Sequence, residues 1–173
     1  MNQLLLIGLF WLAVTDSFAA DPFTTLMLSP RDNKAHVPAI DLPTLSGEII
    51  DSKDWAGHVV MLNFWATWCG PCKEEMPSME RLYRRLQTKP FKLFAVTADI
   101  RRQDIAAFWQ HWDLHFPVLL DEDGDFAQKL WVRTLPTTIV IGPDGRIHGR
   151  AMGPRDWDSP EAIAFIEQLM EPL

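Results

Sequence analysis

The sequence predicts an α/β protein with a mixed, mainly parallel β-sheet and helices on both of its faces. Three short apolar runs, at 58–64, 91–98 and 137–141, have the length and the β-branched and aromatic content of buried strands. Segments with apolar residues at helical spacing lie between these runs and after the last one. Strands that alternate with helices along a chain are typical of a sheet covered by helices.

Helical spacing of apolar residues defines the first two helices, which follow the first and second strands. The residues that carry this spacing are Met76, Met79, Leu82, Tyr83 and Leu86 in the first helix, and Ile105, Phe108, Trp109 and Trp112 in the second. The sequence Gly142-Pro143-Asp144-Gly145 suits a tight turn that joins the third strand to 146–150 as an antiparallel hairpin. A last helix is expected at about 160–170, with Ser159 as its N-cap.

The composition fits one globular domain, because 47% of the 173 residues are hydrophobic and 23% are charged. Sixteen Lys and Arg against 23 Asp and Glu leave a net charge of −7. Nucleic acid is therefore not an expected partner, since binding to phosphates requires a basic surface. The chain has only two Cys and is long enough to bury a full core, so its fold does not depend on a disulfide framework.

The N-terminal residues predict export. The uncharged run 4–14 is about 16 Å long as a helix, too short to span roughly 30 Å of hydrocarbon, and fits the core of a signal peptide. Ser17 and Ala19 place small residues at −3 and −1 of a cleavage after Ala19, so residues 1–19 are expected to be a signal peptide. No Lys or Arg precedes the apolar run, and an uncleaved membrane anchor and a disordered apolar terminus are the alternatives.

Two further regions follow the signal peptide. Residues 20–36 are rich in Pro, Thr, Asp and Asn without periodicity and are expected to form an irregular arm, and residues 37–173 are expected to form the domain. Cleaved or anchored, the domain is expected in an oxidising compartment, periplasmic or otherwise extracytoplasmic.

The two cysteines lie in the sequence Trp68-Cys69-Gly70-Pro71-Cys72-Lys73, at a strand-to-helix turn. Backbone N–H groups and the positive end of the helix dipole favour a thiolate there, with a pKa of roughly 3.5 to 7.5 against about 8.5 for a free thiol. Cys72 is three residues further along the helix, at a Cα distance of about 5 to 6 Å that a disulfide tolerates. Cys69 is therefore the expected nucleophile and Cys72 the resolving thiol.

Two other roles for this pair are less favoured. A structural disulfide that closes a loop of about four residues gains only on the order of 2 kcal/mol. A metal site needs two more ligands, and none of the five His has a ligand-like spacing to the pair. A copper or zinc carrier would require His115 or His148 to approach Cys69. The spacing therefore indicates redox chemistry.

The stretch 59–77 reads VVMLNFWATWCGPCKEEMP and resembles the active-site stretch of the TlpA/ResA-like thiol-disulfide oxidoreductases of the thioredoxin superfamily. Three more segments resemble the same family: a lead-in segment at 37–50, the central FPVLLD at 116–121 and the TLPTT loop at 134–138. With Gly153 and Trp157 before the last helix, the resemblance covers roughly residues 37–173.

This resemblance implies a thioredoxin fold with an insertion between about Asp99 and Leu130. It implies a cis bond before Pro136, in a loop beside the cysteines where the backbone of Leu135 hydrogen-bonds an extended client segment as an added strand does; a simple turn is the alternative. The implied partners are protein thiols and disulfides, with a membrane thiol reductase as the electron donor. No cofactor and no metal is expected, and the protein is expected to be a monomer.

Two residues near the cysteines bear on proton transfer. By resemblance to thioredoxins, which have a buried Asp at this position, Asn63 replaces an acid with an amide. An amide cannot take up or release a thiol proton. Glu75 is on the helix face of Cys72, whereas Glu74 points elsewhere, and TlpA/ResA-like proteins have at this position a Glu that handles protons. The alternative is that Glu75 is an acid stabilised by the helix dipole.

The tryptophans are expected to divide into one exposed residue and several packed ones. Trp68, beside Cys69, is expected to be docking surface for clients, and Trp65 belongs to the first strand and is expected to pack. Packing in the core or between helix and sheet is also expected for Trp109, Trp112, Trp131 and Trp157.

The leading functional hypothesis is an exported reductase or exchanger of protein disulfides. Gly70 and Pro71 between the cysteines resemble reducing thioredoxins, and family members often reduce apocytochrome c thiols. Thr137 follows Pro136 where cytochrome-maturation members commonly have Glu, which weakens that particular assignment. The alternatives are a metal-binding thiol carrier and a peroxiredoxin-type thiol peroxidase, although Thr67 precedes Cys69 by two residues instead of the three usual in peroxiredoxins.

Overall fold

The computed structural model describes residues 26, 28, 29 and 35–171. Its centre is a five-stranded sheet with the order β5-β4-β3-β6-β7, in which the first three strands are parallel and the last two run antiparallel to their neighbours. The expected signal peptide and most of the expected arm lie outside the described residues, so both stay predictions. Within the described part of the chain, no helix is long and apolar enough to cross a membrane.

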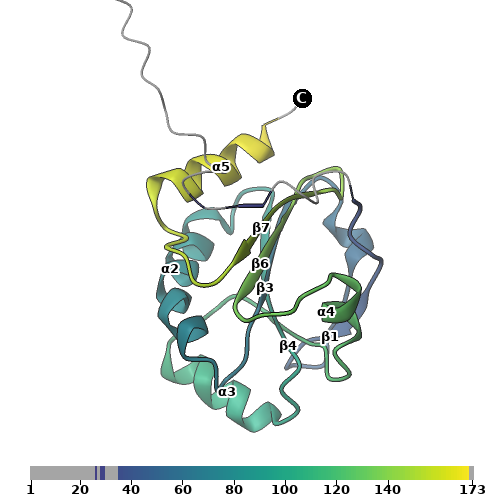
Figure 1. Cartoon of the computed structure of the whole chain (residues 1–173), viewed down its shortest axis with the longest axis vertical. Helices are drawn as coiled ribbons and strands as arrows, with labels where there is room; N and C mark the ends of the chain where they lie inside the picture. Colours follow the sequence, from purple (N-terminus) through teal and green to yellow (C-terminus); the bar gives the residue numbers. More distant parts are fainter. Residues whose placement is uncertain (1–25, 27, 30–34, 172–173) are drawn as a thin grey trace, which may run out of the picture.

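The strands and helices alternate as the sequence predicts (Figure 1). The central strands are β3 (Val59–Phe64), β4 (Phe91–Thr97), β5 (Val118–Leu120), β6 (Thr137–Ile141) and β7 (Ile147–Met152). The helices are η2 (Ser52–Trp55), α2 (Gly70–Leu86), α3 (Arg102–His111), α4 (Asp125–Lys129) and α5 (Pro160–Met170). A separate antiparallel pair consists of β1 (Asp41–Pro43) and β2 (Ile49–Asp51).

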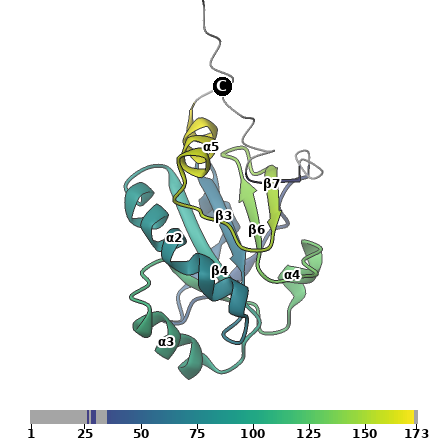
Figure 2. The same ribbon diagram turned by 60° about the vertical axis from the view of Figure 1, so that its left-hand side comes forward.

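Helices cover both faces of the sheet, which confirms the predicted layers. α2, α3 and α5 lie on one face and share a core with the buried residues of the sheet, and η2 and α4 cover the other face (Figures 1 and 2). Every residue of β3 is buried, because this central strand is covered from both sides. β3 leads directly into the cysteine turn, so a fully buried strand positions the site.

The predicted hairpin and last helix are also confirmed. The Gly145 N–H donates to the Gly142 carbonyl at 2.9 Å, and Gly145 has a φ of 76°, which glycine adopts without steric cost. The Ser159 side chain accepts from the Ala162 N–H and caps α5.

Five short elements were not predicted as helices or strands from the residue pattern. These are β1, β2, η2, β5 and α4, none longer than five residues. β5 and α4 lie within the insertion implied by the resemblance. Segments of this length hold too few residues to show a period, and their neighbours in space stabilise them.

Part of the N-terminal region packs on the domain. Leu26 and Leu28 are buried, and Ser29 forms an antiparallel bridge with Arg150 of β7. A Cβ on Gly149 would lie 3.1 Å from the Leu28 side chain, so the glycine admits this leucine to the surface of β7. Leu26, Leu28 and Ser29 therefore belong to the packed body of the protein.

Candidate active site

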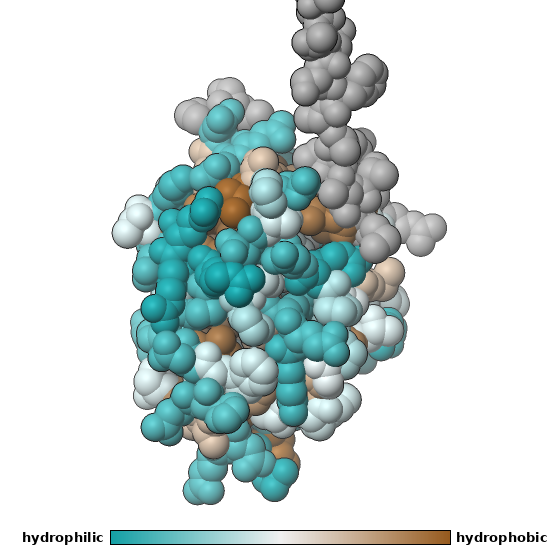
Figure 3. Space-filling model, turned by 90° about the vertical axis from the view of Figure 1, so that its left-hand side faces the viewer, coloured by the Kyte–Doolittle hydropathy of each residue, from teal (hydrophilic) through white to brown (hydrophobic). Residues whose placement is uncertain are grey.

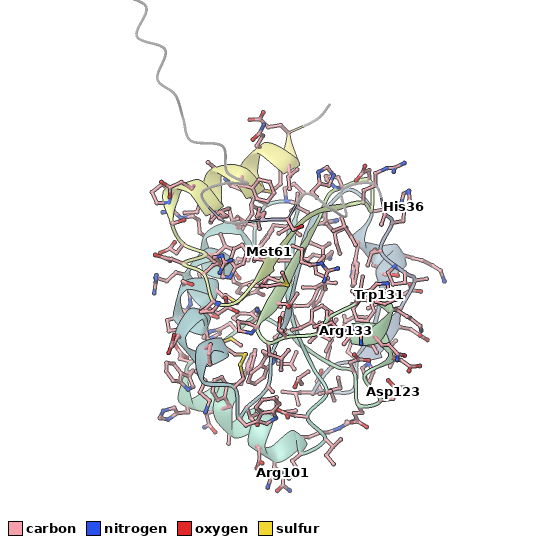
Figure 4. The ribbon with its side chains drawn as sticks, viewed as in Figure 1. His36, Met61, Arg101, Asp123, Trp131 and Arg133 are labelled. Atoms are coloured by element: carbon pink, nitrogen blue, oxygen red, sulfur yellow. A yellow bond between two sulfur atoms is a disulfide. The ribbon has the colours of Figure 1, made fainter. Side chains whose placement is uncertain are left out.

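The two cysteines form a disulfide where β3 leads into α2. Cys69 is the N-cap residue of α2, and its Cα lies 5.3 Å from that of Cys72, within the range expected from the sequence. The Cys72 N–H points to the Cys69 Sγ at 3.3 Å. Cys69 is 5% exposed and Cys72 is fully buried, so Cys69 is the sulfur nearer to the surface. Figure 4 shows this disulfide at the lower end of α2.

The surroundings of Cys69 favour a thiolate in the reduced protein. Its sulfur lies at the N-terminal end of a helix of 17 residues, where the helix dipole is positive, and the first turn contains no acidic residue. Lys73 is in the next turn, with its Nζ 5.8 Å from the centre of the Phe108 ring. The helix dipole stabilises negative charge on Cys69 and agrees with its expected role as nucleophile.

Glu75 is buried one turn after Cys72. The residue is 2% exposed, and its carboxylate accepts three hydrogen bonds: from Asn63 Nδ2 at 2.7 Å, from the Arg155 N–H at 3.1 Å and from Trp157 Nε1 at 3.0 Å. Burial raises the pKa of Glu75 to about 7, although the bonds from Trp157, Arg155 and Asn63 act in the opposite direction. This carboxyl therefore changes its protonation state near neutral pH.

Glu74 differs from Glu75, as the helix spacing predicts. Its side chain is exposed, on the outer face of α2. Glu75 is instead buried, under the loop that carries Arg155 and Trp157.

Asn63 joins Glu75 to the sheet. Its Nδ2 donates to Glu75 and to the Thr138 Oγ1 at 3.0 Å, and its Oδ1 has no partner among the described residues. A half-turn of the amide would present Oδ1 to the hydroxyl of a protonated Glu75. Asn63 therefore cannot carry the proton itself but can satisfy both protonation states of its neighbour.

The proline loop lies at the same edge of the sheet as the cysteines. The Leu135–Pro136 bond is cis, as the resemblance implies. Thr137, the next residue, pairs with Phe64 at the end of β3, which places the loop beside the chain that leads to Cys69. A pocket of about 170 Å³ opens there between Trp68, Leu135 and the ends of β3 and β4, with mainly apolar walls.

The tryptophan predictions are only partly correct. Trp65 packs against Phe108 and Trp109, Trp157 is fully buried, and Trp68 is 74% exposed, all as expected. The prediction that Trp131 packs is wrong, because it is 72% exposed in the turn after α4, where the Arg133 guanidinium lies 5.3 Å from its ring (Figure 4). Trp112 is 39% exposed, because it caps the end of α3 instead of lying within the helix.

Sequence reasoning missed several residues of the site. Arg155 and Trp157 hold the Glu75 carboxylate, and the Asp99 carboxylate accepts from the Thr67 N–H at 2.7 Å and fixes the turn before Cys69. Two signals were available: the resemblance of the segment with Trp157 to the family, and the position of Asp99 just after a strand, at the edge where the cysteines lie.

The two histidines required by a metal carrier have other neighbours. His115 Nδ1 lies 2.9 Å from Glu80, and His148 Nε2 lies 3.4 Å from Asp144. Among the residues that the structure describes, no group of three or more His, Cys, Asp or Glu is arranged to hold a metal ion.

The mixed sheet, the disulfide at the start of a helix and the cis-proline loop beside it define a thioredoxin-fold protein with a redox site. Residues 34–150 match the AhpC/TSA family. The chain therefore belongs to the AhpC/TSA family, and it belongs to the TlpA/ResA-like proteins of the thioredoxin superfamily.

Individual relatives agree with this assignment. The chain is 38% identical over 110 residues to the thiol-disulfide oxidoreductase ResA of Bacillus thuringiensis subsp. konkukian, a match that covers 64% of each chain. It is 36% identical over 144 residues to ResA of Oceanobacillus iheyensis, which covers 78% of this chain and 75% of that one. A solved structure of a candidate thiol:disulfide interchange protein DsbE from Chlorobium tepidum superposes with a TM-score of 0.74 at 28% identity, covering 83% of this chain and 100% of that one.

Proposed function

We propose that the protein is a thiol-disulfide oxidoreductase that reduces the disulfides of other proteins through Cys69 and Cys72. The observation that carries this proposal is the disulfide at the N-terminus of α2, with the nucleophilic sulfur nearer to the surface and a titrating carboxyl one turn behind the buried sulfur. The relatives named as thiol-disulfide oxidoreductases support it.

The reaction transfers two electrons and two protons. The Cys69 thiolate attacks one sulfur of the client disulfide, and the other client sulfur leaves as a thiolate that takes up a proton. Cys72 then loses its proton and attacks Cys69, which breaks the mixed disulfide and releases the second client thiol. The protein is left with the Cys69–Cys72 disulfide, and exchange with a dithiol donor reduces it again.

Glu75 is suited to the proton transfer at Cys72. The two residues are three positions apart on α2 and share a face of the helix. A carboxylate with a pKa near neutrality accepts the Cys72 proton as this thiol attacks, and returns it when the disulfide is reduced. Asn63 serves both states of Glu75, because either end of its amide can face the carboxyl group.

Clients are proposed to bind at the edge formed by Trp68, Leu135 and Pro136. The exposed Trp68 ring supplies apolar contact area beside Cys69. An extended client segment would pair with the backbone of Leu135, and a client side chain would enter the 170 Å³ pocket between this residue and Trp68.

The location and clients are proposed from the export prediction and the family. We propose an extracytoplasmic protein, released or anchored by its N-terminal segment, that receives electrons from a membrane thiol reductase. Thr137 is buried and its hydroxyl donates to the Thr134 carbonyl at 2.7 Å, so it offers no carboxylate to a client. The proposed clients are therefore envelope proteins in general, with apocytochrome c as one candidate among them.

The proposed protein is a monomer. Hydrophilic side chains cover most of the surface formed by the helices, with only small hydrophobic areas between them (Figure 3). The large exposed apolar side chains in the described part of the chain include Trp68, beside the disulfide, where the client is proposed to bind.

Reduction of insulin by dithiothreitol tests the proposed activity. The reduced mature protein should accelerate it, Cys69→Ser should abolish the acceleration, and Cys72→Ser should accumulate mixed disulfides on Cys69. Full activity of Cys69→Ser would refute the assignment of the nucleophile. Consumption of hydrogen peroxide without activity on insulin would favour the thiol peroxidase instead.

A further inference from the structure

The loop between β7 and α5 packs against the first turns of α2 (Figure 2). Ser78 ties the two together, because its hydroxyl donates to the Glu75 carbonyl at 2.7 Å and accepts from the Trp157 N–H at 3.1 Å. The Arg155 guanidinium is held by three backbone carbonyls, of Leu26, Met152 and Pro154. The loop is thus fixed relative to the cysteine helix.

This loop supplies two of the three donors on Glu75. The Arg155 N–H and Trp157 Nε1 both donate to Oε2, while Asn63 donates to Oε1 from the sheet. The carboxylate is therefore held in space from the sheet and from the loop. The donor on the sheet precedes Glu75 by 12 residues, and the donors on the loop follow it by 80 and 82 residues.

The three donors are not equivalent. The Asn63 amide can present either a donor or an acceptor to Glu75, and the donor on Arg155 belongs to the backbone. The indole of Trp157 has one N–H and no acceptor, so it forms its bond best with a charged carboxylate. Trp157 is consequently the side chain whose contact distinguishes charged from neutral Glu75.

We propose that Trp157 is a positioning residue for the disulfide chemistry: its indole N–H holds the Glu75 carboxylate against Asn63 and sets the pH range in which Glu75 exchanges its proton with Cys72. The inference rests on the proposed role of Glu75 in that proton transfer. Nothing in the sequence near the cysteines indicates this residue, which is 82 positions from Glu75.

Other charged groups surround Glu75 and stay in place when Trp157 is changed. A pocket of about 380 Å³ between α2 and the loop is lined by Glu75 and by four charged neighbours: Glu74, Arg81, Arg155 and Asp156. The cysteine pair lies one turn earlier on α2. On the side of the sheet, Asn63 donates to the carboxylate and to Thr138, and both of these residues are neutral. Trp157→Phe therefore removes the indole N–H and leaves these charged groups in place.

The contact itself is tested by nuclear magnetic resonance on the oxidised protein with ¹⁵N-labelled tryptophan. The Trp157 Nε1–H signal should shift with pH with a midpoint near 7, and this shift should be absent in Glu75→Gln. Trp109 provides a matched control, because its Nε1 donates to the Phe116 carbonyl at 2.9 Å and should not follow the titration. A Trp157 signal that does not change between pH 5 and pH 9 would overturn the inference.

The effect on chemistry is tested by the rate at which dithiothreitol reduces the Cys69–Cys72 disulfide, corrected for the thiolate fraction of the reagent. The reagent thiolate attacks Cys69, Cys72 leaves, and protonated Glu75 supplies its proton, so the corrected rate should fall as pH rises through about 7. Trp157→Phe removes a donor that favours the carboxylate, so the fall should move about one pH unit higher. Trp109→Phe should leave it unchanged.

The outcomes separate this inference from the proposed function. An unchanged pH profile in Trp157→Phe, with the fall still lost in Glu75→Gln, would overturn the positioning role and leave Glu75 as the proton carrier. An unchanged profile in Glu75→Gln would refute the role of Glu75, and the positioning role with it. If Trp157→Phe does not fold, Ser78→Ala, which loosens the loop that carries Trp157, should shift the profile in the same direction, and no shift would count against the inference.

Discussion

Two glutamates on α2, Glu75 and Glu80, are buried less than two turns apart. Glu80 has a charged partner, and the hydrogen-bond donors on Glu75 are neutral. Glu80 meets the Arg84 guanidinium at 2.6 Å and the His115 backbone and ring nitrogens at 2.8 and 2.9 Å. Glu75 meets an amide, an indole and a backbone N–H, none of which carries charge. A glutamate of this helix therefore forms an ion pair at position 80, whereas the glutamate at position 75 is a carboxyl group that titrates near neutral pH.

The difference teaches that burial alone does not decide the role of a carboxylate. Neutral donors satisfy the hydrogen-bonding capacity of Glu75 but offset only part of the cost of burying its charge, so its pKa rises to about 7. A guanidinium compensates charge directly, as at Glu80. Three comparisons of variants test this contrast.

The largest expected effect is on stability as a function of pH. Because the pKa of Glu75 is raised in the folded protein, folding binds a proton, and the stability that Glu75 contributes is present below about pH 4.5 and is lost as pH rises through about 7. The oxidised wild type should lose up to about 3 kcal/mol of unfolding free energy between pH 4.5 and pH 8 through this group.

Urea denaturation at several pH values checks this expectation. Glu75→Gln should remove this part of the pH dependence, whereas Glu74→Gln, at an exposed position, should retain it. Equal slopes of stability against pH in Glu75→Gln and the wild type would contradict the raised pKa.

Removing the charge of Glu80 should lower the unfolding free energy near neutral pH, whereas removing that of Glu75 should raise it, and the effect at Glu80 should be smaller. Glu80→Gln keeps an acceptor for the His115 N–H but removes the charge that faces Arg84, and should lower the unfolding free energy by about 1 to 2 kcal/mol at pH 7. Arg84 is half exposed, which limits the loss through solvent screening. A stabilising effect of Glu80→Gln at pH 7 would show that this ion pair does not offset its own burial.

The smallest effect is on the thiols of the reduced protein. A charged Glu75 disfavours a second negative charge on the cysteines, so Glu75→Gln should lower the apparent thiol pKa values of the pair by about one unit and slow exchange. Alkylation rates measured across pH report this change. Glu80→Gln and Glu74→Gln are the matched controls. If the alkylation rate depends on pH in Glu75→Gln as it does in these two variants, Glu75 does not influence the thiol pKa values.

The sequence by itself determined the chemistry of the cysteine turn and the order of the main elements. A strand that ends at Trp-Cys-Gly-Pro-Cys and a helix that begins there are local features, as are the helical spacing in α2, the turn at 142–145 and the Ser159 cap. Such features depend on neighbours within a few residues, and the pattern of side chains records them directly. The fold family, and with it the cis bond before Pro136, followed from the resemblance of longer stretches.

Only the tertiary structure decided how these parts work together. The strands β1, β2 and β5 and helix α4 are too short to show a period, and Trp131 is exposed because a left-handed turn directs it away from the core. The environment of Glu75 is assembled from β3, α2 and the loop before α5, whose residues are 12 to 82 positions apart. Helix spacing places Glu75 behind Cys72, but its pKa depends on which groups the folded chain brings to a buried carboxylate, and no local pattern records that.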